Sequence, residues 1–181
     1  FCSDFILQQY YRDIRISSIY EGTTGIQSQD LLGRKITMNS GEGLKLLLNE
    51  ILTTVAKANN HPELKPYANS ISEKIKLSEK VLTSLMPHAL KGDFEKYLAD
   101  ASVFMEFFSL IIVAWNWLEV ATNSLEALNK GDKKYDDLFY NSKIETMKYF
   151  FDYELPKTVS HSEILMNPSS VTIKKDKEIL I

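Results

Sequence analysis

Apolar residues recur at helical spacing beyond residue 43, and they predict four long helices. The first spans residues 44 to about 59, the second 66 to about 90, the third 94 to about 130, and the fourth ends near Pro156. The first has an apolar residue at i, i+3, i+4 and i+7, which places one face of the helix inside: Leu44, Leu47, Leu48, Ile51, Leu52 and Val55. The third is apolar nearly all round, which indicates that neighbouring elements cover it on several sides.

Short breaks separate these helices. Gly92-Asp93 and Gly131-Asp132 each combine a break with a residue suited to cap the helix that follows. Four long helices joined by short loops predict an all-α fold, an antiparallel up-down four-helix bundle. The clearest linker is residues 39–43, Asn-Ser-Gly-Glu-Gly. We therefore expect a first unit at 1–40, an accessory helical domain at 41–165, and a tail at 166–181, in which residues 170–173 form either a short strand or a disordered segment.

The N-terminal segment 1–40 contains a different pattern. Residues 4 to about 17 can form a helix, and Glu21-Gly22-Thr23-Thr24-Gly25 then breaks it. The two glycines allow backbone conformations and close approaches that a Cβ atom would block. Thr23 or Thr24 is suited to cap a short helix that we expect to end near Gly33. Glu21 is thus predicted to lie on a turn.

The order and spacing of this segment are specific. Arg12-Asp13-Ile14-Arg15-Ile16 is followed by Ile19-Tyr20-Glu21-Gly22-Thr23 and then by Ile26-Gln27. This run resembles the segment that carries the catalytic glutamate in flavin-dependent acyl-CoA dehydrogenases. Asp30-Leu31-Leu32-Gly33-Arg34-Lys35 and the long helical extension behind it look like the larger bacterial members with an extra C-terminal helical domain, a group that includes dimethylsulfoniopropionyl-CoA-type enzymes. The resemblance implies that residues 1–40 are the last helices of the family's C-terminal helical domain.

The resemblance also implies a chemistry. Glu21 would be the base that removes the α-proton of an acyl-CoA thioester while the β-hydrogen leaves as hydride to N5 of FAD. Its backbone N–H would help a flavin ribityl hydroxyl bind the thioester carbonyl. Gly22 would lie against the substrate, and the cofactor would contact Thr23, Thr24 and Gly25, with Gln27 as a weaker addition. An electron-transfer flavoprotein would reoxidise the flavin.

The position of the motif departs from the family pattern. In that family the segment follows three other structural units, whereas Glu21 is the twenty-first of 181 residues here. We therefore expect this chain to be the C-terminal portion of a larger enzyme, and to be inactive and unable to hold FAD by itself. The apolar third helix suggests that the accessory domain packs on the missing domains or on a second subunit, forming a homo-oligomer. The alternative is a non-catalytic helical oligomerisation or protein-interaction domain with an inert first segment.

Composition narrows the possible partners. The net charge is −3, with no basic block of the kind that follows a phosphate backbone, so nucleic acid is not an expected partner. Cys2 is the single cysteine, which excludes an internal disulfide and fits a reducing, cytoplasmic compartment. The start lacks the features of a signal peptide. The most apolar run, residues 104–118, is interrupted by polar residues and is shorter than a bilayer span, so we interpret it as a buried helix.

Metal chemistry is not expected. The three histidines, His61, His88 and His161, lack helical metal-ligand spacing with any second ligand. Glu106 and Glu119 have no Glu-x-x-His partners, so we interpret them as solvated or paired side chains. One further set is aromatic, and either core packing or an outer face against another subunit could explain it: Phe107, Phe108, Trp115, Trp117, Tyr149, Phe150, Phe151 and Tyr153.

Overall fold

The computed structural model describes residues 5–20, 22–130, 133–169 and 173. Every regular element among these residues is helical, which confirms the all-α class. In chain order the elements are α1 Leu7–Ile14, the 3-10 turn η1 Arg15–Ser18, α2 Thr24–Asp30, the π turn η2 Leu31–Lys35, α3 Met38–Ala58, α4 Lys65–Leu90, α5 Phe94–Leu98, α6 Ala101–Lys130, α7 Asp137–Tyr149, the π turn η3 Phe150–Glu154, and α8 Lys157–Leu165. Residues 170–173, expected to form either a short strand or a disordered segment, lie outside the described residues except for Ile173.

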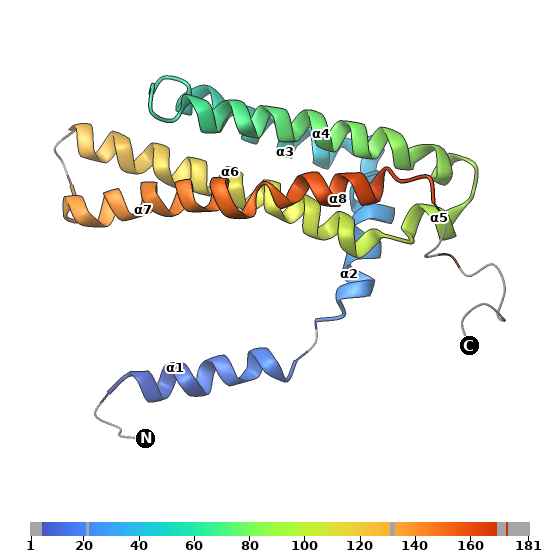
Figure 1. The fold of residues 1–181 in the computed structure, drawn as a ribbon, viewed down its shortest axis with the longest axis horizontal. Helices are drawn as coiled ribbons and strands as arrows, with labels where there is room; N and C mark the ends of the chain where they lie inside the picture. The colour runs from blue at the N-terminus through green and yellow to red at the C-terminus, as the bar shows by residue number, and fades with distance from the viewer. Residues whose placement is uncertain (1–4, 21, 131–132, 170–172, 174–181) are drawn as a thin grey trace.

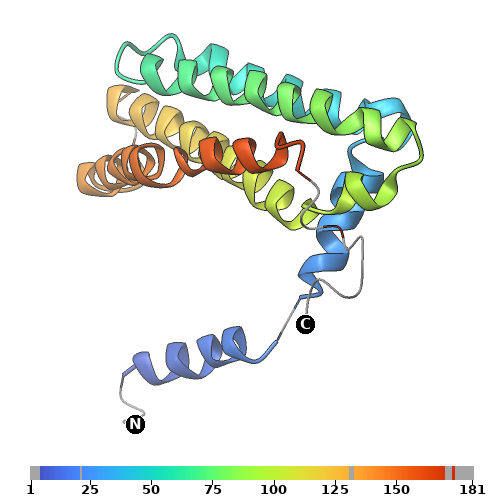
Figure 2. The same ribbon diagram turned by 45° about the vertical axis from the view of Figure 1, so that its right-hand side comes forward.

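Four helical rods run lengthwise and form the body of the molecule: α3, α4, α6, and α7 continued by α8 (Figure 1). Successive rods run in opposite directions, and α6 packs against α3, α4, α7 and α8. The 45° turn in Figure 2 shows α1 standing away from this body, joined to it through α2. The elements next to residues 21–27, the candidate motif, therefore lie at the end of the helical body where α5 is placed (Figure 1).

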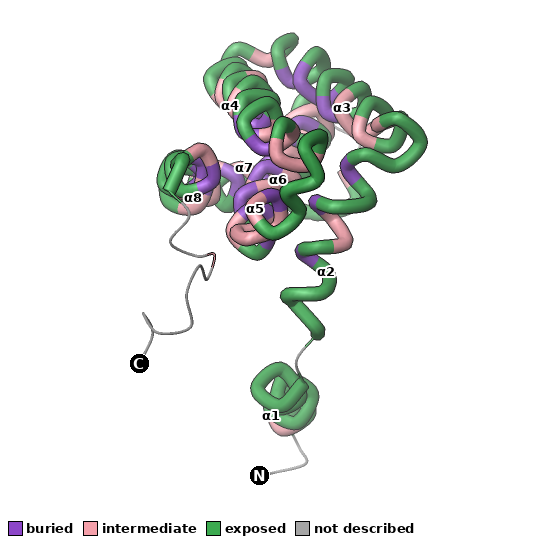
Figure 3. Tube along the Cα trace, turned by 90° about the vertical axis from the view of Figure 1, so that its right-hand side faces the viewer, coloured by how far each residue is buried: buried purple, intermediate pink, exposed green. Residues whose placement is uncertain are grey.

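Two groups of buried side chains hold the rods together. The hairpin-end core lies between α3, α4, α6 and α7, toward the α3–α4 turn: Ile51, Val55, Ala58, Leu64, Ala68, Ile71, Ile75, Ala114, Leu118, Ala121, Met147, Phe151 and Leu155. The junction core lies toward the other end: Leu32, Ile36, Val81, Leu85, Tyr97, Ala101, Phe104, Phe107, Ile111 and Leu165. Figure 3 shows how the buried positions gather on the faces that point inward. Because η2 and the turn after it supply Leu32 and Ile36, the N-terminal segment 1–40 shares a core with the helices behind it.

The structure differs from the prediction by one extra break and one extra helix. The third predicted helix is divided into α5 and α6 by a turn at Ala99 and Asp100, although neither residue signals a break. The break lets α5 reach η2, where Leu98 packs on Gly33. The fourth ends near Pro156 as predicted, since η3 ends at Glu154, but Pro156 is the N-cap of a further helix, α8, that was not predicted. Proline is compatible with this position because the N–H that it lacks has no obligatory partner at a helix start.

The predicted linker contains a sharp backbone break. Asn39, Ser40 and Gly41 have φ values of 50°, 59° and 79°, so three successive residues leave the right-handed helical conformation inside α3. Left-handed φ is unfavourable for residues other than glycine, which makes Asn39 and Ser40 locally strained. The amphipathic pattern resumes at Leu44, as the periodicity indicates, but Leu52 lies beside the buried face and not on it, since it is 50% exposed. The domain boundary after residue 40 stays a prediction.

The central helix α6 is the most apolar element. By length and composition it could cross a membrane, as can the core helix of a soluble protein. In this structure helices pack around it, and its outward positions carry Glu106, Ser109 and Asn116 among others. On its inner side, the indole N–H of Trp115 donates a 2.8 Å hydrogen bond to Oγ1 of Thr54 in α3. The core interpretation thus holds for much of the aromatic set.

Candidate functional site

The candidate motif occupies the link between α1 and α2. Glu21, the predicted base, lies outside the described residues. Residues 22–27 are described, and all of them are exposed. Of the two threonines that the sequence offers as helix caps, Thr23 occupies the N-cap position of α2 and Thr24 begins the helix. The α-helix ends at Asp30 and the π turn that contains Gly33 continues it to Lys35, so the helical segment ends near Gly33 as predicted.

Thr23 has an unusual conformation for a β-branched residue. Its φ of 54° and ψ of 44° are left-handed, and its carbonyl accepts the N–H of Gln27 at 2.9 Å. Its hydroxyl does not cap the helix but donates to the carbonyl of Gly22 at 2.6 Å. Left-handed backbone at such a residue costs energy that the surroundings must compensate, and it is a recognised mark of functional turns.

The two motif glycines have open space beside them. A Cβ atom added to Gly22 or Gly25 would meet nothing within 4 Å, and neither has a positive φ. The conformation and packing of this chain therefore give no reason for glycine at either position. The open space is compatible with the close approach of a flat molecule or of a backbone from outside the described residues.

The part of α2 that follows the motif is tied to the body. The Ser28 side chain is fully buried, and its hydroxyl donates to the Gly25 carbonyl at 2.9 Å. Its oxygen lies 3.2 Å from the hydroxyl of Ser102 on α6. Further along, the buried hydroxyl of Tyr97 on α5 donates to the Leu32 carbonyl at 2.8 Å. Burial raises the pKa of Tyr97 above its ordinary value, so the phenol stays protonated near neutral pH.

An ion pair lies on the outer side of the same segment. Asp30 accepts two hydrogen bonds from the guanidinium of Arg34, at 2.5 and 2.9 Å, and Lys35 lies 3.6 Å away. The hydrogen bonds from Arg34 lower the pKa of Asp30, and the same pairing raises the pKa of Arg34. Because this group is exposed, its contribution to stability is small. The pairing keeps both Asp30 and Arg34 charged at the surface of the π turn.

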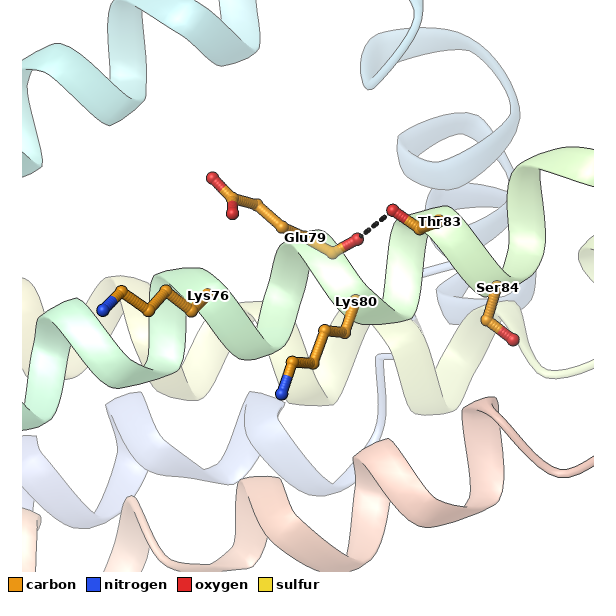
Figure 4. Close-up of a pocket in the computed structure, with 5 residues that line it drawn as sticks. All are labelled: Lys76, Glu79, Lys80, Thr83 and Ser84. Atoms are coloured by element: carbon orange, nitrogen blue, oxygen red, sulfur yellow. Dashed lines mark hydrogen bonds between the residues drawn. The ribbon is translucent and has the colours of Figure 1, made fainter.

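Two surface hollows of the body are separate from this motif. A shallow one of about 580 Å³ is lined by five residues of α4 alone, two of them lysines, with the Thr83 hydroxyl bonded to the Glu79 carbonyl (Figure 4). A hollow of about 340 Å³ lies beside the strained turn at Ser40 and Gly41 and is lined by Leu82 and Met86 of α4. Neither is lined by residues 22–27, so neither extends the candidate site.

Each histidine faces a carboxylate in a different part of the fold. The pairs are His61 with Glu126 at 3.9 Å, His88 with Asp93 at 3.8 Å, and His161 with Glu106 at 3.4 Å. Glu106 is thus a paired residue, one of the two interpretations that the sequence allows, whereas Glu119 is exposed. Within the described ranges no three His, Cys, Asp or Glu side chains gather in a way that could hold a metal ion.

Sequence reasoning missed Tyr97 and Ser102. Tyr97 lies 65 positions from Leu32 and Ser102 lies 74 positions from Ser28, and neither belongs to a recognisable motif. A tyrosine at the inner face of a short helix gives no sign of which carbonyl it reaches. No sequence signal predicts the π turn that makes the Leu32 carbonyl available, because such a turn needs neither glycine nor proline at a fixed position.

Comparison with known proteins identifies relatives. Residues 47–175 match a family model described as acetyl-CoA dehydrogenase C-terminal like. The chain is 26% identical over 171 residues to the broad-specificity linear acyl-CoA dehydrogenase FadE5 of Mycobacterium tuberculosis, an alignment that covers 91% of this chain and 28% of that protein. It is 28% identical over 160 residues to the 3-methylmercaptopropionyl-CoA dehydrogenase of Ruegeria pomeroyi, covering 86% and 26%.

A third relative extends the match to the whole chain. A butyryl-CoA dehydrogenase of Syntrophomonas wolfei is 26% identical over an alignment of 199 positions, which covers 100% of this chain and 30% of that protein. This alignment therefore includes the motif at 21–27 as well as the helical body. The chain spans between a quarter and a third of the length of these relatives.

Proposed function

This chain belongs to the acyl-CoA dehydrogenase family, and from that premise we propose that it is the C-terminal part of an FAD-dependent enzyme. The enzyme removes one hydrogen from each of the α and β carbons of an acyl-CoA thioester. The observation that carries the proposal is the segment that follows Glu21 in the sequence: Gly22 and Gly25 are exposed with open space beside them, and Thr23 between them has a left-handed backbone.

The roles follow the chemistry that the reaction needs. Glu21 removes the α-proton, because a carboxylate held against one side of an acyl chain can act as base. Gly22 lies against the thioester, where the space beside its Cα leaves room for the substrate. When bound, the flavin supplies the acceptor for the β-hydrogen, which leaves with its electron pair.

Four further residues fit the cofactor. Thr23 and Thr24 offer hydroxyl groups, Gly25 offers an approach that no Cβ atom blocks, and Gln27 offers an amide on the exposed side of α2. We propose that these residues hold FAD in the complete enzyme. The rest of the enzyme would complete the flavin site, and in keeping with this residues 22–27 line neither of the hollows at the turn and on α4. We expect the isolated chain to be inactive.

The surface of the N-terminal region supports a larger assembly. Leu7, Tyr10 and Ile14 lie on one stripe of α1 and are 70%, 58% and 67% exposed. Apolar stripes of this kind are normally covered by other protein. We propose that the rest of the enzyme covers them, that the enzyme is a homo-oligomer, and that an electron-transfer flavoprotein takes the electrons.

The test is a single substitution in the full-length polypeptide. Glu21→Gln removes the base and keeps the size of the side chain, so we expect dye-coupled oxidation of an acyl-CoA to fall by about 10²- to 10⁴-fold while flavin absorbance stays stoichiometric. Glu42→Gln, at an exposed position of α3, is the matched control and should keep wild-type turnover. Unchanged turnover in Glu21→Gln would refute the proposal.

One competing function has an observation in its favour. The exposed stripe of α1 and the stacked, exposed rings of Tyr149 and Tyr153 would also suit a non-catalytic oligomerisation or interaction domain. In that case Glu21→Gln would leave every activity of the parent protein unchanged. Substitution of the α1 stripe would instead change its oligomeric state.

A further inference from the structure

The π turn η2 creates a hydrogen-bond acceptor that α5 uses. In an α-helix the N–H of Ile36 would pair with the Leu32 carbonyl, four residues earlier. Here it pairs with the Leu31 carbonyl at 3.0 Å, five residues earlier. The Leu32 carbonyl thereby loses its α-helical donor, and the hydroxyl of Tyr97 donates to it at 2.8 Å. Leu32 and Tyr97 are both buried, so water does not reach the Leu32 carbonyl. The hydroxyl of Tyr97 therefore satisfies an acceptor that would otherwise be buried without a donor.

A second connection reaches the motif from α6. Ser28 has one hydroxyl proton, and it goes to the Gly25 carbonyl at 2.9 Å. The 3.2 Å contact between the Ser28 and Ser102 oxygens is therefore a bond that Ser102 donates. The chain of bonds runs from α6 to the backbone of Gly25. That residue belongs to the candidate motif.

Close packing accompanies both bonds. A Cβ atom at Gly33 would lie 3.3 Å from Cδ2 of Leu98, so the π turn and α5 are in contact with little space between them. Leu32 is fully buried and Ile36 is 7% exposed, both within the junction core. The segment is thus held by two hydrogen bonds from the accessory helices and by apolar packing on the same side.

We propose that Tyr97 and Ser102 are positioning residues: they fix α2 and η2 against the body and thereby set where the exposed motif stands. This gives the accessory helices a role in catalysis without contact with the substrate. The inference rests on the proposed function for its catalytic consequence. Its structural part, an anchored α2–η2 segment, stands without it.

The structural part is tested by hydrogen exchange on this chain. Tyr97→Phe removes one hydroxyl, and Ser102→Ala removes the other. Each should speed exchange of the amides in residues 24–36 by about fivefold, the factor that one net hydrogen bond is worth, with the α3–α4 hairpin as an unchanged internal reference. Tyr149→Phe and Ser109→Ala, at exposed positions, are the matched controls.

The catalytic part is tested in the full-length enzyme. Tyr97→Phe should lower kcat by about tenfold and leave KM for the acyl-CoA within about twofold, because a displaced base affects the reaction more than substrate binding. Unchanged exchange at 24–36 in both anchor variants would overturn the anchor. Faster exchange with wild-type kcat would overturn its catalytic role. If Glu21→Gln kept full turnover while exchange rose as expected, the proposed base would fail and the anchor would stand.

Discussion

Leu32→Ala tests whether the motif segment and the helical body unfold together. Leu32 is fully buried in the junction core, although it comes from the N-terminal segment 1–40. Truncating a fully buried leucine costs the lost transfer free energy and leaves a cavity, because the surrounding helices relax only in part. We expect the free energy of unfolding to fall by about 3 kcal/mol. For a chain of this size, that lowers Tm by about 6–12 °C.

The assay is urea unfolding followed by tryptophan fluorescence. Both tryptophans, Trp115 and Trp117, lie on α6, and the N-terminal segment 1–40 contains neither. A fall of about 3 kcal/mol with an m-value of about 2 kcal/mol/M moves the fluorescence midpoint by about 1.5 M urea. Leu46→Ala is the matched control: this α3 leucine is 62% exposed, so its truncation should cost less than about 0.5 kcal/mol.

A particular result would refute this reasoning. If Leu32→Ala left the fluorescence transition unchanged while far-ultraviolet circular dichroism showed an earlier loss of helix, the N-terminal segment 1–40 would unfold as a separate unit. The boundary predicted after residue 40 would then mark two independently stable parts. Coincident shifts in both signals would show one cooperative unit that contains α2, η2 and the rods.

Three further predictions concern single contacts. Thr54→Val should lower the free energy of unfolding by about 1–2 kcal/mol in the same urea assay, because it leaves the indole N–H of Trp115 without its 2.8 Å acceptor; an unchanged midpoint would contradict this. Asp136→Ala should cost about 1 kcal/mol and speed amide exchange in the first turn of α7, since its carboxylate accepts the N–H of Phe139 at 2.8 Å; equal exchange would show that the cap is dispensable. Burial raises the pKa of Tyr97, so the stability that this phenol contributes is complete below the unfolded pKa of about 10 and is lost as pH rises through the folded pKa. Above a pH of about 10 the Tm should therefore fall more steeply with pH in wild type than in Tyr97→Phe, and parallel Tm curves would contradict this.

Periodicity predicted the rods because burial on one face leaves a direct mark on the sequence. Residues 66–90 illustrate this. Their helical spacing predicts an inner face of Ile71, Ile75, Val81, Leu82 and Leu85; four of the five are buried in α4 and Leu82 is partly buried. The class was predictable for the same reason. Helix α8 was not predictable, because Pro156 is a usual sign of helix termination, and only the structure shows that it caps a new helix beginning at Lys157.

Contacts between distant residues left no comparable mark. The break between α5 and α6 at Ala99 and Asp100 has no glycine or proline, and it follows from where Tyr97 and Leu98 pack. The pairing of His161 with Glu106 was equally hidden, because it joins α8 to α6 and so depends on how two separate helices pack. The motif was recognisable because its order and spacing are local. Its anchors were not, because two hydroxyl groups on other helices supply them.

The two ends of the α2–η2 segment differ in a way that suits the proposed chemistry. At the C-terminal end, Leu32 is fully buried and its carbonyl is bonded to Tyr97. At the N-terminal end, Gly22 and Gly25 are exposed with open space beside them. A short helix on its own is marginally stable, so an exposed turn keeps a fixed position only if the rest of the helix is held. The α2–η2 segment meets that condition, because its C-terminal end is packed and hydrogen-bonded while its N-terminal end stays exposed. The helices that follow the motif in the sequence thus supply the contacts that hold the motif in place.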